Sequence, residues 1–191
     1  NTHEATRRNR FEAEVIAFHE AVPGHHLERA SAAELEDVPT FQQRGGYMAY
    51  SEGWGLYSER LADEMGLYSS DTMRLGMLAA DAWRSTRLVV DTGIHALGWS
   101  RSQAIEFFVA HVPLDPEEAA VEVDRYIGMP GQALSYKVGQ REILRLRDDA
   151  RARLGERFRI ERFHTTVLRH GGVPLALLAD LVDDWVERET T

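Results

Sequence analysis

The sequence predicts an all-α protein of about eight helices, and three observations support this prediction. Apolar residues recur at helical spacing through most of the 191 residues. Helix start and stop signals, such as Asp115-Pro116 and the glycines after several apolar stretches, separate these segments. The alternating pattern of a half-buried strand is weak throughout. We therefore expect helices packed on helices.

The expected helices follow from these signals in chain order. An apolar stripe at Phe11, Val15, Phe18 and Val22 opens the first helix, and Pro23-Gly24 disturbs it. Between residues 34 and 46 the sequence reads as a loop. The expected helices cover residues 11–22, 47–65, 71–97, 100–111, 115–127, 132–154, 157–169 and 174–187.

Composition limits the possible function classes. The formal net charge is −9, which argues against a nucleic-acid partner and against adhesion to an anionic membrane. The chain has no cysteine, so disulfides, thiolate nucleophiles and cysteine-based zinc sites are excluded. No apolar run reaches the ~20 residues of a membrane helix. Residues 1–191 are expected to form a single domain, and localisation stays open because the N-terminus carries neither an initiator Met nor a signal peptide.

A candidate metal motif lies at the end of the first expected helix, as His19-Glu20-Ala-Val-Pro-Gly-His25-His26. Two imidazoles and an adjacent carboxylate are what a zinc hydrolase needs. On a regular helix, however, residues six apart are about 9 Å apart along the axis, too far for one ion. A bulge at Pro23-Gly24 can shorten this distance, making His25 the second ligand if two residues are absorbed and His26 if three are. We favour His25.

Glu52 is the best candidate for a third ligand. It lies in the expected helix over residues 47–65, beside three small residues, Ser51, Gly53 and Gly55. Glycine inside a helix costs up to ~1 kcal/mol, so two of them suggest that this helix packs closely against another.

Four sequence blocks resemble one known family. They are HEAVPGHHL, SEGWGLYSE, VDTGIH and GMPGQALSYKVG, and the resemblance runs from about residue 11 to about residue 185. The chain resembles the bacterial family catalogued as domain of unknown function 885, which looks like a gluzincin-type zinc peptidase group. Members are longer, so the resemblance implies a C-terminal catalytic portion whose cleft is completed by a missing N-terminal helical half.

The resemblance also implies roles for the motif residues. In gluzincins two His of the first motif and a later Glu bind zinc, and the Glu of the motif activates water. Carried over, His19, His25 and Glu52 hold Zn²⁺, and Glu20 is the general base. The spacing between the two His departs from the standard motif.

Further candidates lie in or just before the other two blocks. Arg87, Asp91 and His95 share one helical face, where Asp91 could orient a ligand imidazole, Arg87 could fix Asp91 and His95 could lie near the substrate. The alternative is a surface salt-bridge ladder.

At the helix start after Pro130-Gly131, Tyr136 could donate to an oxyanion or could be a core aromatic. Three further residues are candidates for a supporting or substrate-binding role: His26, Gln132 and Lys137. These patterns predict a zinc metallopeptidase acting on a peptide substrate. The alternatives are a non-catalytic, metal-stabilised helical module and a zinc amidase or esterase.

Overall fold

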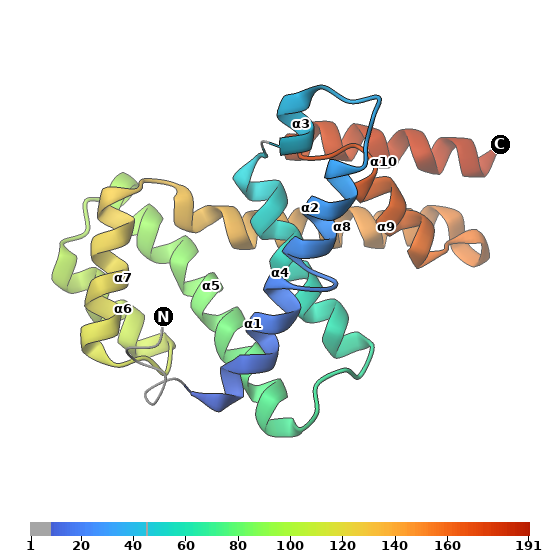
Figure 1. Cartoon of the computed structure of the whole chain (residues 1–191). Coiled ribbons are helices and arrows are strands. Elements are labelled where there is room, and N and C mark those ends of the chain that lie inside the picture. The colour runs from blue at the N-terminus through green and yellow to red at the C-terminus, as the bar shows by residue number, and fades with distance from the viewer. Residues whose placement is uncertain (1–8, 45) are drawn as a thin grey trace.

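The computed structural model describes residues 9–44 and 46–191, and within these residues it is all-α, as predicted (Figure 1). All eight expected helices are present in it, and two short ones add to them. The helices are α1 (Ala13–Glu20), α2 (His25–Ala33), α3 (Thr40–Arg44), α4 (Met48–Glu64), α5 (Asp71–Leu97), α6 (Arg101–His111), α7 (Pro116–Gly128), α8 (Ser135–Leu154), α9 (Ile160–Leu168) and α10 (Leu175–Thr190).

Several helix boundaries follow directly from local sequence signals. Ser70 caps α5 through its side chain, and Gly98 ends that helix in the left-handed conformation. Ser100 caps α6 in a capping box, and Asp115 caps α7 with Pro116 in the first helical position. The expectation of a loop over residues 34–46 is wrong in part, because α3 forms there.

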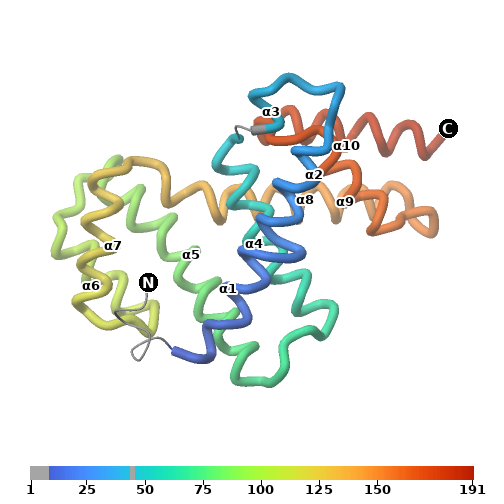
Figure 2. The backbone as a smooth tube through the Cα atoms, viewed as in Figure 1, coloured from blue at the N-terminus to red at the C-terminus, as the bar shows by residue number. Residues whose placement is uncertain are grey.

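The helix α4 lies at the centre of the molecule and packs along α8 (Figures 1 and 2). Gly53 of α4 faces Gly139 of α8 so closely that a Cβ on Gly53 would lie 2.5 Å from the Cα of Gly139. This confirms the close approach expected from the glycines of α4. The larger hydrophobic core lies on this side, with α8, α9 and α10 around Trp54 and Tyr57.

A second core holds α5, α6 and α7 together around Val90, Phe108 and Tyr126. In Figures 1 and 2 these helices lie on the opposite side of α4 from α9 and α10, and α1 runs between the two groups. A small third cluster of Val15, Met77 and Ala80 joins α1 to α5. The architecture thus places α1 where both cores meet.

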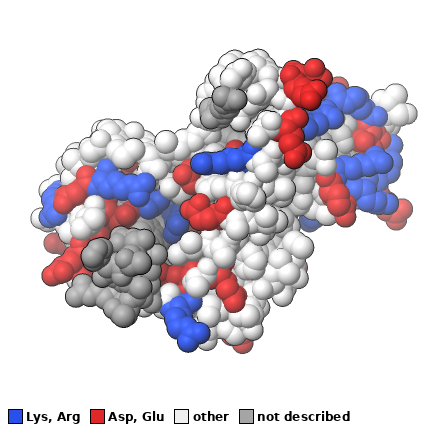
Figure 3. Space-filling view, in the orientation of Figure 1, with Lys and Arg blue, Asp and Glu red and all other residues white. Residues whose placement is uncertain are grey.

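Over the described residues, none of the helices has both the length and the apolar character that crossing a membrane requires. The face drawn in Figure 3 shows acidic and basic side chains side by side, outside the atoms drawn in grey.

Candidate metal centre

The helical chain breaks between α1 and α2, and this break shapes the candidate site. Ala21 and Gly24 have non-helical backbone angles, and a side chain at Gly24 would collide with the carbonyl oxygens of Phe18 and His19. From α4, the indole N–H of Trp54 donates to the Pro23 carbonyl at 2.9 Å. The expected disturbance at Pro23-Gly24 is therefore a tight connection between two helices, which α4 holds in place.

The break brings His25 next to His19. Their ring centroids lie 4.7 Å apart and the rings are perpendicular. Both side chains are buried, whereas His26 is exposed and does not line the cavity described below. Of the two alternatives, the structure thus places His25, and not His26, beside His19.

One face of α4 receives the His19 imidazole. Glu52, Gly55 and Glu59 are spaced so that they share this face. The ring lies over Gly55, where a Cβ would come within 2.7 Å of its Cε1 atom. Nε2 faces Glu52 at 3.4 Å, and Nδ1–H donates to Glu59 at 2.7 Å. Gly55 is required here because any side chain would displace the imidazole.

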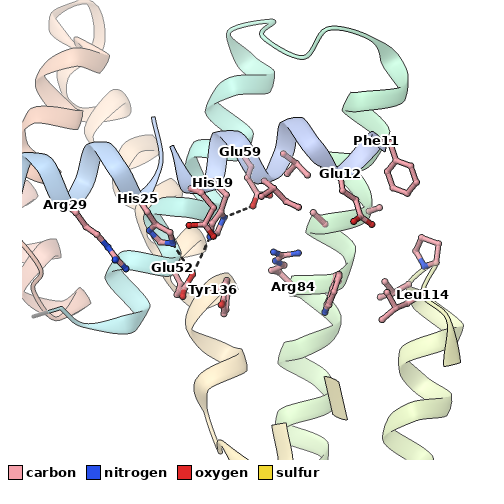
Figure 4. A pocket seen from close by; sticks show the side chains of 18 residues that line it. Phe11, Glu12, His19, His25, Arg29, Glu52, Glu59, Arg84, Leu114 and Tyr136 are labelled. Carbon is pink, nitrogen blue, oxygen red and sulfur yellow. Dashed lines mark hydrogen bonds and ion pairs between the residues drawn. The ribbon is translucent and has the colours of Figure 1, made fainter. Parts of the chain in front are cut away.

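Three nitrogen and oxygen donors converge from α1, α2 and α4 (Figure 4). Nε2 of His19 and Nε2 of His25 each lie 3.4 Å from Oε2 of Glu52, and the three donor atoms are all within 4.8 Å of one another. Tetrahedral ligands about 2.0–2.1 Å from one zinc ion are separated by about 3.3–3.4 Å. The two imidazole–carboxylate separations match this value, so the three donors could hold a zinc ion with a fourth position for water.

Each imidazole also has an acidic partner on its outer nitrogen. Glu59 accepts from Nδ1–H of His19 and is buried. Glu28 lies 3.5 Å from Nδ1 of His25 and accepts a hydrogen bond of 2.7 Å from Ser51. Carboxylates in this position fix the tautomer and orientation of metal-binding histidines. Both Nε2 atoms thus point to the common centre.

The electrostatic field at this centre favours positive charge. Burial lowers the pKa of His25, but hydrogen bonds and charge interactions with Glu28 and Glu52 outweigh burial and raise that pKa to about 9. Burial lowers the pKa of His19 as well, but the interactions with Glu52 and Glu59 outweigh burial and raise that pKa overall. Burial raises the pKa of Glu52, and the two imidazoles lower it well below its usual range. A divalent cation that displaces the imidazole protons suits the same field.

A cavity of about 510 Å³ opens beside the donors, a size typical of small-molecule sites. Glu20, the predicted base, is exposed at its edge, next to His19 in the chain. Tyr136 lies in its wall with its ring roughly parallel to that of His19, at a centroid distance of 6.3 Å. The structure thus brings Glu20 and Tyr136, two of the three residues predicted to be catalytic, to the cavity that holds the donors, whereas the third, His95, does not line it.

The predicted supporting row on α5 does not serve the ligands. The Asp91 carboxylate accepts from the backbone N–H of Gly131, at 3.1 and 3.2 Å, instead of orienting a histidine. Arg87 pairs with Glu122 at 2.9 Å instead of fixing Asp91. His95 is exposed, does not line the cavity and lies 2.9 Å from the Tyr126 carbonyl. The expectation failed because helical spacing shows only that residues share a face of their helix, and not which neighbouring helix or turn that face contacts.

Two further expectations are corrected in the same way. Lys137 pairs with Asp81 at 2.6 Å, and Gln132 has a buried Oε1 without a described partner; neither lines the cavity.

Sequence reasoning missed residues that do belong to the site, although two of them carried a signal. Glu59 follows Glu52 by seven residues, which is two helical turns, and Glu28 follows His25 by three. Ser51 and Arg84 had no such signal, because only the packing of separate helices brings them here.

The family described as bacterial protein of unknown function, DUF885, matches residues 1–182. The chain belongs to this family. The match confirms the family resemblance of the sequence blocks and leaves the activity of DUF885 proteins open. No curated protein matches the sequence.

Two solved structures are similar to this DUF885 chain over most of its length. A candidate lipoprotein from Colwellia psychrerythraea shares 42% identity over 94% of the chain, with a TM-score of 0.91. A candidate lipoprotein of unknown function from Shewanella oneidensis shares 26% identity over 91%, with a TM-score of 0.84. The chain covers 31% and 32% of these two proteins, about a third of their length.

Proposed function

We propose that this chain carries the catalytic centre of a zinc-dependent peptidase. The observation that supports it best is the convergence of His19, His25 and Glu52, in which both imidazole nitrogens lie 3.4 Å from the carboxylate oxygen, the separation of ligands in a tetrahedral zinc site. The same three ligand types, two histidines of one motif and a later glutamate, occur in the gluzincin peptidases that the sequence resembles. Bound zinc would polarise the substrate carbonyl and acidify the attacking water.

Glu20 is the proposed general base. It follows His19 directly, is exposed at the edge of the cavity and has no side-chain partner among the described residues. A carboxylate in this position can take a proton from the attacking water and pass it to the leaving amine, so that the peptide C–N bond breaks. A purely structural metal site would not need a second, free carboxylate beside its ligand.

Tyr136 is the proposed oxyanion donor. Its ring lies between the His19 imidazole and the Arg87 guanidinium, whose central carbon is 4.7 Å from the ring centroid. These contacts hold the ring at the cavity wall. From there the phenol can donate a hydrogen bond to the carbonyl oxygen as negative charge develops on it.

Two features of the solved relatives extend the proposal to the whole protein. Both are described as candidate lipoproteins, which favours an exported location for this protein as well. Because the chain covers only about a third of each relative, we propose that the remaining part of the protein, an N-terminal helical portion, completes the cleft.

The decisive experiment is peptide-library cleavage by the complete protein, with and without a chelator, for wild type and Glu20→Gln. We expect cleavage that the chelator abolishes and zinc restores. Loss of a general base should lower kcat about 10²–10⁴-fold while zinc content stays unchanged. Glu12→Gln is the matched control, because Glu12 lines the same cavity away from the donors (Figure 4).

The competing functions give different results. A metal-stabilised binding module would retain zinc but cleave nothing, and Glu20→Gln would have no effect. An amidase or esterase would hydrolyse small amides or esters and leave the peptide library intact.

A further inference from the structure

The cavity beside the metal centre also contains a guanidinium group that no described acid neutralises. Arg84 reaches from α5 into the cavity, between the metal donors and Leu114 (Figure 4). Its Nε is buried and finds no hydrogen-bond partner among residues 9–44 and 46–191. A buried donor without an acceptor is rare in folded proteins and indicates that a ligand or water completes the site.

Three other cations with buried or half-buried side chains are paired. Arg87 pairs with Glu122 at 2.9 Å and Arg147 with Glu64 at 2.8 Å. Lys137 lies 2.6 Å from Asp81. Arg87 and Arg147 each also have one buried nitrogen without a described partner, so the feature that distinguishes Arg84 is the lack of a described ion pair at a position inside the cavity.

Acidic groups are close at hand, yet Arg84 forms no described ion pair with them. Four carboxylates line the same cavity: Glu12, Glu20, Glu52 and Glu59. The guanidinium carbon of Arg84 instead lies 5.2 Å from the centroid of the Trp83 ring and 5.9 Å from that of Tyr136. Cation–π contacts hold an arginine without neutralising it. Its hydrogen-bonding groups stay free for an anion that enters from solvent.

We propose that Arg84 binds the terminal α-carboxylate of a peptide, so that the protein releases one apolar residue from the C-terminus. The planar guanidinium matches a carboxylate through two parallel hydrogen bonds. Much of the cavity lining is apolar and suits an aliphatic or aromatic side chain, and Leu114 lies beyond Arg84 at the end where Glu12 also lies (Figure 4). The apolar lining includes Val15, Ala80, Trp83, Val112, Pro113 and Leu114.

This inference rests on the proposed hydrolysis and specifies its substrate. Along the cavity the metal donors come first, Arg84 lies in the middle and Leu114 lies at the far end (Figure 4). A C-terminal residue with its carboxylate on Arg84 and its side chain toward Leu114 places the preceding peptide bond toward the donors. Water adds to that carbonyl, the C–N bond breaks, and the proton passes to the amine of the released amino acid.

The test compares paired substrates on the complete, zinc-loaded protein. The first is a blocked tripeptide ending in leucine with a free carboxylate, and the second is the same peptide with a C-terminal amide. We expect wild type to favour the free acid in kcat/KM by about tenfold to a hundredfold, the range for a charge-assisted hydrogen-bonded pair. In Arg84→Gln this ratio should fall close to one.

Arg29→Gln is the matched control. Arg29 is exposed, lines the cavity near His25 and carries the same charge (Figure 4). If positive potential alone attracted the carboxylate, both variants would lose the preference, whereas we expect only Arg84→Gln to lose it. The inference is overturned if wild type cleaves acid and amide equally, or if Arg84→Gln slows both substrates by the same factor, as an oxyanion donor would.

A binding measurement separates this inference from the proposed function. N-acetyl-glycyl-leucine and its amide are titrated calorimetrically into metal-free protein, so that neither turnover nor zinc contributes. Tighter binding of the free acid that disappears in Arg84→Gln supports the carboxylate site even if no peptide is cleaved. Equal binding of acid and amide overturns it, whatever the peptidase assay gives.

Discussion

Two clusters of polar side chains lie on neighbouring helices, and they differ in what their charged groups contact. The metal centre on α1, α2 and α4 directs three donors at one point beside an open cavity. The second group, which we call the α5 row, consists of Arg87, Asp91 and His95. Its members contact Glu122, the backbone N–H of Gly131 and the backbone carbonyl of Tyr126.

This difference in partners distinguishes a candidate reactive centre from a structural network. In the α5 row each interaction ends on another protein group, so the row ties α5 to α7 and to the turn before α8. In the metal centre the outer nitrogens face Glu59 and Glu28, and the inner donor atoms of His19, His25 and Glu52 face one another beside the cavity. This arrangement is the basis of the proposal that an external cation completes the site.

The largest expected effect separates the two adjacent histidines of the metal centre. His25→Ala should abolish stoichiometric zinc binding and activity, with an affinity loss above the roughly hundredfold typical of an outer carboxylate. His26→Ala should retain both, because His26 is exposed and away from the donors. Zinc content by atomic emission after dialysis measures this. Full zinc retention in His25→Ala would remove it from the ligand set.

The next effect concerns the α5 row and should appear in stability instead of metal content. Arg87→Met removes the ion pair with Glu122, which keeps only the Tyr126 hydroxyl and the more distant Arg125 as partners, and breaking a buried ion pair costs up to about 3–5 kcal/mol. Urea unfolding should show this loss in the free energy of unfolding, while zinc content of the folded protein stays at the wild-type value. If instead Arg87→Met loses zinc at unchanged stability, the row belongs to the metal centre.

Tyr136 contacts one residue of each cluster, so a substitution there tests whether its role is catalytic or structural. Its ring contacts His19 on one side and the Arg87 guanidinium on another. Tyr136→Phe keeps these ring contacts and removes only the hydroxyl. We expect kcat to fall about 10²–10³-fold with zinc content and stability unchanged. An unaltered kcat would make Tyr136 a purely structural aromatic.

The sequence alone predicted the helical class from local patterns, and it named His19, Glu52 and either His25 or His26, with a preference for His25, as the converging donors. Caps such as Ser70 and Asp115 depend on their own side chains and the next few residues. The interruption at Pro23-Gly24 could also be predicted from the sequence. The number of residues that it absorbs could not be predicted, because this depends on Trp54 of a distant helix, which donates to the Pro23 carbonyl.

The misplaced residues show where such reasoning stops. Arg87, Asp91 and His95 do share a helical face, yet α7 and the turn at Gly131 cover it, and their positions depend on tertiary packing. Glu59 was missed although it repeats Glu52 two turns later. Its role becomes visible only once the His19 ring is placed over Gly55, between the two carboxylates.

The smallest expected effect compares one isosteric change in each cluster. Glu59→Gln keeps a hydrogen-bond acceptor for His19 Nδ1–H but removes its charge, and outer carboxylates of this kind contribute about 10–100-fold to metal affinity. Asp91→Asn makes the same change in the α5 row and should leave zinc affinity untouched, because its carboxylate serves the Gly131 backbone. Zinc titration against a competing chelator measures both. If the two variants lower zinc affinity equally, the metal centre and the α5 row form a single network, and the distinction between them by their contacts is wrong.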